Sequence, residues 1–263
     1  MKSVFQNVSD TNIAYSNVKG SALKDGKLTE EGINKLLNQV RNLYDERREL
    51  INDGFTVLLK NSSSPEGRKE MFDAMADLLV FLHGVGHFID SEIKYTPYDN
   101  LYVLPEFFEN ADGDIARLRP GMPEFYERFS QTLGQHIDFL VSAIKAGDLE
   151  SIKHFYKVID NDIIFLFNKY KKEKFTVELL IERATISNLS KLCSNQQEVN
   201  ETLKYYRDLG VEVDVKDSLL NQENGTPFLV VYSVKNQIVK NKEYREGKAL
   251  KNVNWKLPEF GDF

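Results

Sequence analysis

The sequence predicts an all-α protein, a helical bundle followed by a small C-terminal β-hairpin. Three observations support this fold class. Apolar residues recur at three- and four-residue steps over most of residues 29–193, which is the period of an α-helix. Acidic residues on two of these segments repeat at the same spacing. After residue 200 the pattern changes to the alternation typical of strands.

Composition limits the class of protein. The chain has 263 residues, 41% hydrophobic and 28% charged, as in an ordinary globular protein. Its net charge of −6 argues against a nucleic-acid partner, which would favour a basic face. A single cysteine, Cys193, excludes an intramolecular disulfide and a cysteine-built zinc site. Without a signal-peptide core or a long apolar window, we expect a cytoplasmic protein with no membrane partner.

The N-terminal half predicts two long helices after an irregular arm. Residues 1–28 are polar with scattered glycines and predict no regular element. Thr29 is a suitable cap for a helix that continues to about Asn52, where Asp53-Gly54 interrupts it and residues 55–60 could extend it. After a loop at 61–65, a second helix is expected over residues 66–89. Its part from Leu78 onward is apolar in almost every direction, which indicates burial on most sides.

The second half predicts three more helices and then strands. Residues 91–122 contain prolines and glycines and predict an irregular connector. Helices are expected at about 123–146, 149–171 and 175–193. Residues 210–215 and 226–233 alternate like strands, with Asn224-Gly225 as the turn, and an extended tail follows. The predicted organisation is an arm (1–28), a helical domain (29–200) and a C-terminal hairpin with its tail (201–263).

An internal repeat is one open interpretation. The segment that begins at Asp77 (Asp-Leu-Leu-Val-Phe-Leu) is similar to the one that begins at Asp162 (Asp-Ile-Ile-Phe-Leu-Phe). Glu46 and Glu49 have a weaker counterpart in residues 135–138. A degenerate second helical copy and a chance similarity of two helical hairpins both explain this pattern.

Five carboxylates are the strongest functional signal: Glu46, Glu49, Glu70, Asp73 and Asp77. Each set lies along one side of its helix, and two such helices packed together would crowd like charges. A hard cation would relieve this repulsion, and Mg²⁺ is the usual ion where phosphates are handled. Two other interpretations remain open: a solvated acidic face, and a salt-bridge network with nearby bases (Arg47, Arg48, Arg68 and Lys69).

Two further groups of polar residues are weaker signals. His83 and His87 are four residues apart, but no Glu follows His83 as a zinc-protease motif requires, so we expect core or cleft-edge histidines. The segment 187–191 (Ser-Asn-Leu-Ser-Lys) places an amide, two hydroxyls and an ammonium close together. Such groups can bind phosphate oxygens or a sugar.

These residues together resemble a known family, the all-α nucleoside triphosphate pyrophosphohydrolases. This superfamily includes the MazG-like proteins, phosphoribosyl-ATP pyrophosphohydrolase and the dimeric dUTPases, and the resemblance is closest to its phage-type branch. It rests on four segments: Asp45-Glu46-Arg-Arg-Glu49-Leu50, Asp73-Ala-Met-Ala-Asp77, Ser187-Asn-Leu-Ser-Lys191, and Lys251-Asn-Val-Asn254-Trp255-Lys-Leu-Pro258.

The resemblance implies a MazG-like bundle that hydrolyses a (deoxy)nucleoside triphosphate to the monophosphate and pyrophosphate. It implies Mg²⁺, with Mn²⁺ as a substitute, held by Glu46, Glu49, Asp73 and Asp77, and a proton acceptor in Glu46 or Glu49. It also implies substrate contacts from Asn188, Lys191, Lys251, Asn254 and Trp255. Ala74 stands where many members carry Glu, which leaves the number of metal ions open.

The expected function is therefore control of a nucleotide pool in a phage or bacterium, with a nucleotide as the substrate. The alternatives are a nucleotide-sequestering protein on the same fold without turnover, and a helical interaction protein with solvated acids. The resemblance implies a homo-oligomer, a dimer or tetramer, whereas a true repeat would give a pseudo-dimeric monomer.

Overall fold

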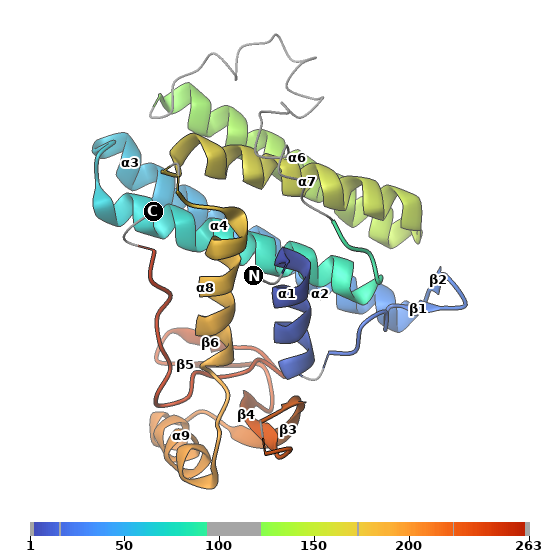
Figure 1. Ribbon diagram of the computed structural model, residues 1–263, viewed down its shortest axis with the longest axis vertical. Helices are drawn as coiled ribbons and strands as arrows, with labels where there is room; N and C mark the ends of the chain where they lie inside the picture. Colours follow the sequence, from blue (N-terminus) through green and yellow to red (C-terminus); the bar gives the residue numbers. More distant parts are fainter. Residues whose placement is uncertain (1–2, 16, 94–121, 173, 223, 261–263) are drawn as a thin grey trace. The chain divides into compact units, whose positions relative to one another are not determined.

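The computed structural model describes residues 3–15, 17–93, 122–172, 174–222 and 224–260 (Figure 1). The described chain forms two compact units. Unit 1 comprises Met1–Val8, Lys19–Ala184 and Glu259–Phe263, and unit 2 comprises Ser9–Val18 and Thr185–Pro258. The predicted boundary at residue 200 therefore differs from the division by contacts, which lies within a helix at residue 185.

Unit 1 is built on four long helices: α2 (Glu30–Glu49), α4 (Pro65–Phe88), α6 (Pro123–Ala146) and α7 (Leu149–Tyr170). Helix α2 packs against α4, and α6 packs against α7. These two pairs join because α2 also contacts α6 and α4 also contacts α7 (Figure 1). The mainly helical fold class is thus confirmed.

Local sequence explains where these helices begin and end. The side chain of Thr29 accepts a hydrogen bond from Gly32 N–H, and Ser64 caps Gly67 in the same way at the start of α4. Gly147 ends α6 with a φ of 68°, a left-handed conformation that glycine adopts without strain. Asp148 then caps α7 by accepting from Ser151 N–H at 3.1 Å.

The predicted interruption at Asp53-Gly54 is wrong. Instead, α2 continues through one wide π-helical turn, η1 (Leu50–Phe55), into the short helix α3 (Thr56–Lys60). Gly54 is needed for packing rather than for a break, because a Cβ there would lie 3.2 Å from Cα and Cβ of Met71 on α4. The wide turn keeps both Leu50 and Phe55 in the core.

The predicted irregular arm over residues 1–28 is also wrong. It contains helix α1 (Val4–Ala14) and a small antiparallel pair, β1 (Leu23–Lys24) and β2 (Lys27–Leu28). Val4 and Val8 are fully buried in the core of unit 1. Their four-residue spacing is helical, but most of the residues of α1 are polar, so the period is difficult to recognise in the sequence. Of the predicted connector 91–122, residues 94–121 lie outside the described residues.

Unit 2 combines short helices with two hairpins. Helix α8 (Val177–Leu189) enters it at Thr185, and α9 (Gln196–Leu209) follows. Strand β3 (Val213–Asn221) pairs antiparallel with β4 (Pro227–Ser233), and β5 (Gln237–Val239) pairs with β6 (Lys242–Tyr244). The predicted hairpin is confirmed. Helix α9 was not predicted, although Asn195 caps its start and Gly210 ends it at a φ of 92°.

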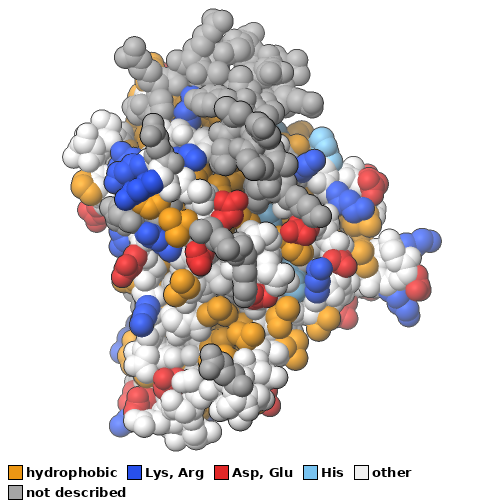
Figure 2. Space-filling model, in the orientation of Figure 1, with side chains coloured by type: hydrophobic (Ala, Val, Ile, Leu, Met, Phe, Trp, Pro, Cys, Tyr) orange, Lys and Arg blue, Asp and Glu red, His pale blue; other side chains and the backbone are white. Residues whose placement is uncertain are grey.

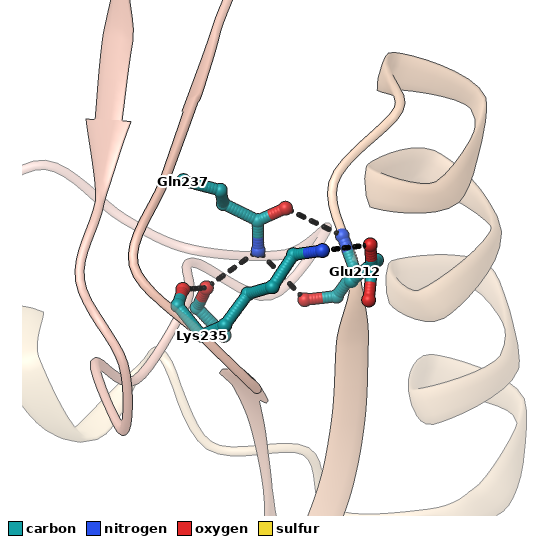
Figure 3. Close-up of polar contacts among 4 residues, drawn as sticks. Glu212, Lys235 and Gln237 are labelled. Carbon is teal, nitrogen blue, oxygen red and sulfur yellow. Dashed lines mark hydrogen bonds and ion pairs between the residues drawn. The ribbon is translucent and has the colours of Figure 1, made fainter.

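A side-chain cross-link holds Glu212, the residue before β3, to Gln237 at the start of β5. The amide of Gln237 accepts from Glu212 N–H and donates to Glu212 C=O, both at 2.9 Å (Figure 3). It thereby copies the pattern of a neighbouring strand. Lys235 adds an ion pair to the Glu212 carboxylate. These contacts organise a part of unit 2 that has few backbone ladders.

The core of unit 1 contains two buried histidine–aspartate pairs. Nε2 of His83 lies 3.0 Å from Oδ1 of Asp160, and its Nδ1 lies 2.8 Å from the hydroxyl of Tyr156. Nδ1 of His136 lies 2.6 Å from Oδ2 of Asp162. All four side chains are buried, which confirms His83 as a core residue. Since Asp77 is only half-buried while Asp162 lies in the core, the two similar segments do not place their aspartates in equivalent surroundings.

The buried pair of His83 and Asp160 leads to a prediction about stability. Asp160→Ala should lower the free energy of unfolding by about 1–3 kcal/mol, because it removes the carboxylate that faces the buried Nε2 of His83. Urea unfolding followed by circular dichroism measures this loss. Glu150→Ala on the same helix is the matched control, since Glu150 is exposed and pairs only with Lys153 on the surface. Equal losses for both variants would contradict the prediction.

Candidate functional site

Four of the five carboxylates singled out from the sequence, all but Glu70, are neighbours between α2 and α4. Burial raises the pKa of Glu46 to about 9, assisted by the charges of Asp77, Glu49, Asp73 and Asp45, in that order. Glu46 and Glu49 come from α2, whereas Asp73 and Asp77 come from α4. The other three predicted metal ligands, Glu49, Asp73 and Asp77, therefore each act electrostatically on Glu46 in the folded chain. We call these five residues, Asp45 included, the acid cluster.

Helix packing explains why these acids are close to each other. Leu36, Val40 and Leu43 turn one side of α2 into the core, which leaves Glu46 half-buried at the flank. On α4, Asp73 and Asp77 are also half-buried while the residues around them are fully buried. Because α2 packs along α4, the two flanks lie together. Glu70, on the same side of α4, is not among the charges that raise the pKa of Glu46.

Three nearby arginines each have a defined partner. Arg47 crosses to α6, where its Nε and Nη2 donate to the carbonyl of Ser130 at 3.0 and 2.8 Å. A Cβ on Gly134 would lie only 2.9 Å from the guanidinium of Arg47, so the glycine makes room for this side chain. Arg68 donates to the carbonyl of Tyr170 at the end of α7. Arg48 pairs with Asp45 of the acid cluster at 3.3 Å.

The acid cluster offers an oxygen-only donor set. Carboxylate oxygens are the ligands that Mg²⁺ and Mn²⁺ accept, and the pKa of Glu46 is raised first by burial and then by the charges of four neighbouring acids. In the part of the chain that the structure describes, no three His, Cys, Asp or Glu side chains converge as a ready-made metal site. The acid cluster fits a hard cation in the type and charge of its side chains. Because these side chains are neighbours but do not converge on one point, cation binding would have to draw them together.

The predicted substrate-binding residues all lie in unit 2, where the fold joins two motifs that are distant in sequence. Nζ of Lys191 donates to Oδ1 of Asn188 at 2.5 Å. Nζ of Lys251 lies 3.3 Å from the ring centroid of Trp255, a cation–π contact. Asn254 donates to the carboxylate of Glu198 at 3.2 Å. The substrate roles of these side chains remain predictions.

The two serines of the same motif have other partners than the sequence indicated. Their hydroxyls were expected among the groups that could bind phosphate or sugar. Instead Ser187 donates to the carbonyl of Lys256 at 2.8 Å, and Ser190 accepts from Lys256 N–H at 3.0 Å. Both hydroxyls therefore hold the C-terminal segment, a use that only the tertiary structure reveals.

A separate depression of about 430 Å³ lies in unit 2 between the end of α9 and β3. None of the predicted site residues lines it. Its walls are mostly backbone and valine side chains, with one arginine and one glutamate: Arg207, Gly210, Val211, Glu212, Val213 and Val234. It offers little chemistry compared with the acid cluster.

The surface adds one general feature. On the face drawn in Figure 2, acidic and basic side chains are interspersed, as expected for a chain whose charges nearly balance. Among the described helices, none has both the length and the apolar character that a membrane span requires.

Comparison with known proteins gives one distant relative. The chain is 26% identical over 201 residues to "Uncharacterized protein L479" of Acanthamoeba polyphaga mimivirus, an alignment that covers 74% of this chain and 72% of the viral protein. No protein-family model matches the chain. No solved structure matches it.

Crowding in the acid cluster makes a pH prediction. Folding raises the pKa of Glu46 from 4.5 to about 9, so the folded state binds its proton more tightly than the unfolded state. Without divalent cations, the free energy of unfolding should therefore fall as the pH rises through this range, by at most about 1.4 kcal/mol per pH unit. Urea unfolding in EDTA at pH 5 to 8 measures the slope.

Two variants test the cause of that slope. Glu46→Gln should flatten it and stabilise the protein at pH 8, because an amide neither titrates nor repels its neighbours. Glu31→Gln, an exposed acid of the same helix that pairs with Lys35, should keep the slope of the wild type. A Glu46→Gln variant with an unchanged slope would show that the acid cluster is not strongly coupled.

Proposed function

We propose that this protein is a Mg²⁺-dependent hydrolase that cleaves a nucleoside or deoxynucleoside triphosphate to the monophosphate and pyrophosphate. The observation that carries the proposal is the crowding around Glu46, where charges from α2 and α4 meet in a half-buried position. Such repulsion is unfavourable in the isolated chain and is useful where a cation and an anionic substrate complete the site.

The residues of the acid cluster would divide the work. Glu46, Glu49, Asp73 and Asp77 would hold the cation, which supplies neutralisation of the polyphosphate and a lowered pKa of a bound water. Glu49 is the more exposed of the two α2 acids and is suited to accept a proton from water. Because its pKa is raised to about 9, Glu46 should keep its proton near neutral pH in the cation-free protein, and binding of a cation should release that proton.

Two further observations support this proposal. In unit 2, Asn188 and Lys191 lie within hydrogen-bond distance of each other, so an amide and an ammonium are available together for phosphate or sugar oxygens. The relative from a giant virus agrees with a virus-borne or phage-borne enzyme, although that protein has no described activity.

An activity panel tests the proposal. The protein is incubated with each common NTP and dNTP in Mg²⁺, and release of pyrophosphate is measured. Turnover of at least one nucleotide is expected. Tight nucleotide binding without any pyrophosphate would instead favour a sequestering protein on the same fold, the second candidate function.

Substitutions assign the residues. Asp77→Asn or Glu49→Gln should lower kcat at least about 100-fold, because each removes a carboxylate from the charge that holds the cation. Folding should be unaffected or slightly more stable, as repulsion is relieved. Glu70→Gln is the matched control on α4, since Glu70 lies outside the acid cluster, and it should retain near wild-type kcat. Near-native activity of the first two variants would refute the site.

Cation binding can be tested without any nucleotide. Mg²⁺ or Mn²⁺ should raise the melting temperature of the wild type, because a ligand that binds only the native state stabilises it. The rise should disappear in Asp77→Asn and persist in Glu70→Gln. An equal rise in all three proteins would indicate binding elsewhere, and no rise at all would favour a solvated acidic face.

A further inference from the structure

Residues 251–258 form an irregular segment that is unusually well held. They contain no helix or strand, so their backbone groups cannot be satisfied by a regular ladder. Asn252 is nevertheless buried, and its side chain donates to the carbonyl of Leu192 at 2.7 Å. The neighbours of this segment in unit 2 supply the remaining hydrogen bonds.

Helix α8 holds the middle of the segment through one residue. Ser187 lies in the last turn of α8, and Ser190 directly follows the helix, where its N–H still bonds to the carbonyl of Ile186. Ser187 donates to the carbonyl of Lys256, and Ser190 accepts from the N–H of the same residue. Ser190 also donates to the carbonyl of Ser187 at 2.7 Å, which orients its hydroxyl. Both backbone groups of Lys256 are therefore fixed by this pair of serines.

Helix α9 holds the beginning of the segment in a similar way. Tyr206 donates its hydroxyl to the carbonyl of Lys251 at 3.1 Å, and Thr202 accepts from Val253 N–H at 3.2 Å. These two side chains are one helical turn apart. Two helices thus immobilise residues 251–256, between which Lys251 lies over the ring of Trp255.

We infer that Ser187 and Ser190 are positioning residues for nucleotide binding: they fix residues 251–258 to the end of α8 and the turn after it, the part of the chain that also carries Asn188 and Lys191. The inference rests on the proposed function, in which side chains of both segments contact the substrate. Nε1 of Trp255 is buried and has no hydrogen-bond partner among the described residues, so one donor of the segment is left for a ligand. Pre-organising it removes an ordering cost from ligand binding.

The chain contains its own reporter for this arrangement, because Trp255 is the single tryptophan. In Ser187→Ala/Ser190→Ala, the emission of Trp255 should shift to the red and its quenching by acrylamide should increase. Amide exchange of residues 252–257 should accelerate roughly fivefold for each hydrogen bond lost. Ser142→Ala, an exposed serine of α6 that bonds within its own helix, is the control and should change neither signal.

Substrate kinetics distinguish positioning from a purely structural role. The double variant should raise KM for the nucleotide about tenfold or more while kcat at saturation changes less than about twofold, because ordering is then supplied by binding energy. Ser190→Thr keeps a hydroxyl, so this variant should retain the KM and the Trp255 emission of the wild type. If the double variant does not fold, the single variant Ser190→Ala is measured in the same way.

The outcomes separate the two proposals. Unchanged emission and exchange in the serine variants would overturn the attachment itself, whether or not the protein is an enzyme. A released segment with an unchanged KM would overturn the positioning role. Absence of nucleotide turnover and binding in the wild type would refute both the proposed function and the substrate role of this segment, while the emission and exchange data would still decide whether the serines hold it.

Discussion

The arrangement of unit 1 depends on the burial of α4. This helix contacts α2, α7 and the π-helical turn η1, and from Leu78 to Ile89 nearly every side chain lies in the core. Few positions on it can carry charge without a large penalty. Asp73 and Asp77 are half-buried exceptions beside the flank of α2, and this leaves them where Glu46 and Glu49 act on them. The packing that stabilises the bundle therefore also concentrates the acids.

Unit 1 shows two different solutions for carboxylates placed away from water. Asp160 and Asp162 on α7 are fully buried, and each has a histidine within hydrogen-bond distance, from α4 and α6 respectively. Burial raises the pKa of Asp162, while the hydrogen bond from His136 opposes that rise. In the acid cluster the main neighbours that act on Glu46 are other acids, which add to the effect of burial. Each aspartate of α7 therefore faces a histidine, whereas the charges that act on Glu46 are those of other acids, and this contrast supports the proposed cation site.

Unit 2 obtains order where regular secondary structure is scarce. Side chains replace missing backbone partners in several places. Gln237 bonds to both backbone groups of Glu212 next to β3, and Ser187 with Ser190 does the same for Lys256. Such contacts fix irregular segments without a large core, because each buried backbone group that finds a partner avoids a desolvation penalty. Loops held in this way can present functional side chains at defined positions.

The amino-acid sequence alone determined the long helices, the side of α4 that carries the acids, and the β3–β4 hairpin. Each follows from the local spacing of residues and from turn or capping residues such as Thr29, Gly147 and Asn224. The sequence did not reveal α1 or α9, whose apolar positions are few, nor the turn at Gly54, where close approach to Met71 decides the conformation. Only the tertiary structure decided that Glu46 lies among four other acids while Glu70 does not, and that His83 and His136 pair with aspartates of α7. It also decided that the serines near Asn188 bind backbone. Sequence spacing gives the face of a helix on which a side chain lies, but which partner lies opposite that face depends on how distant segments pack.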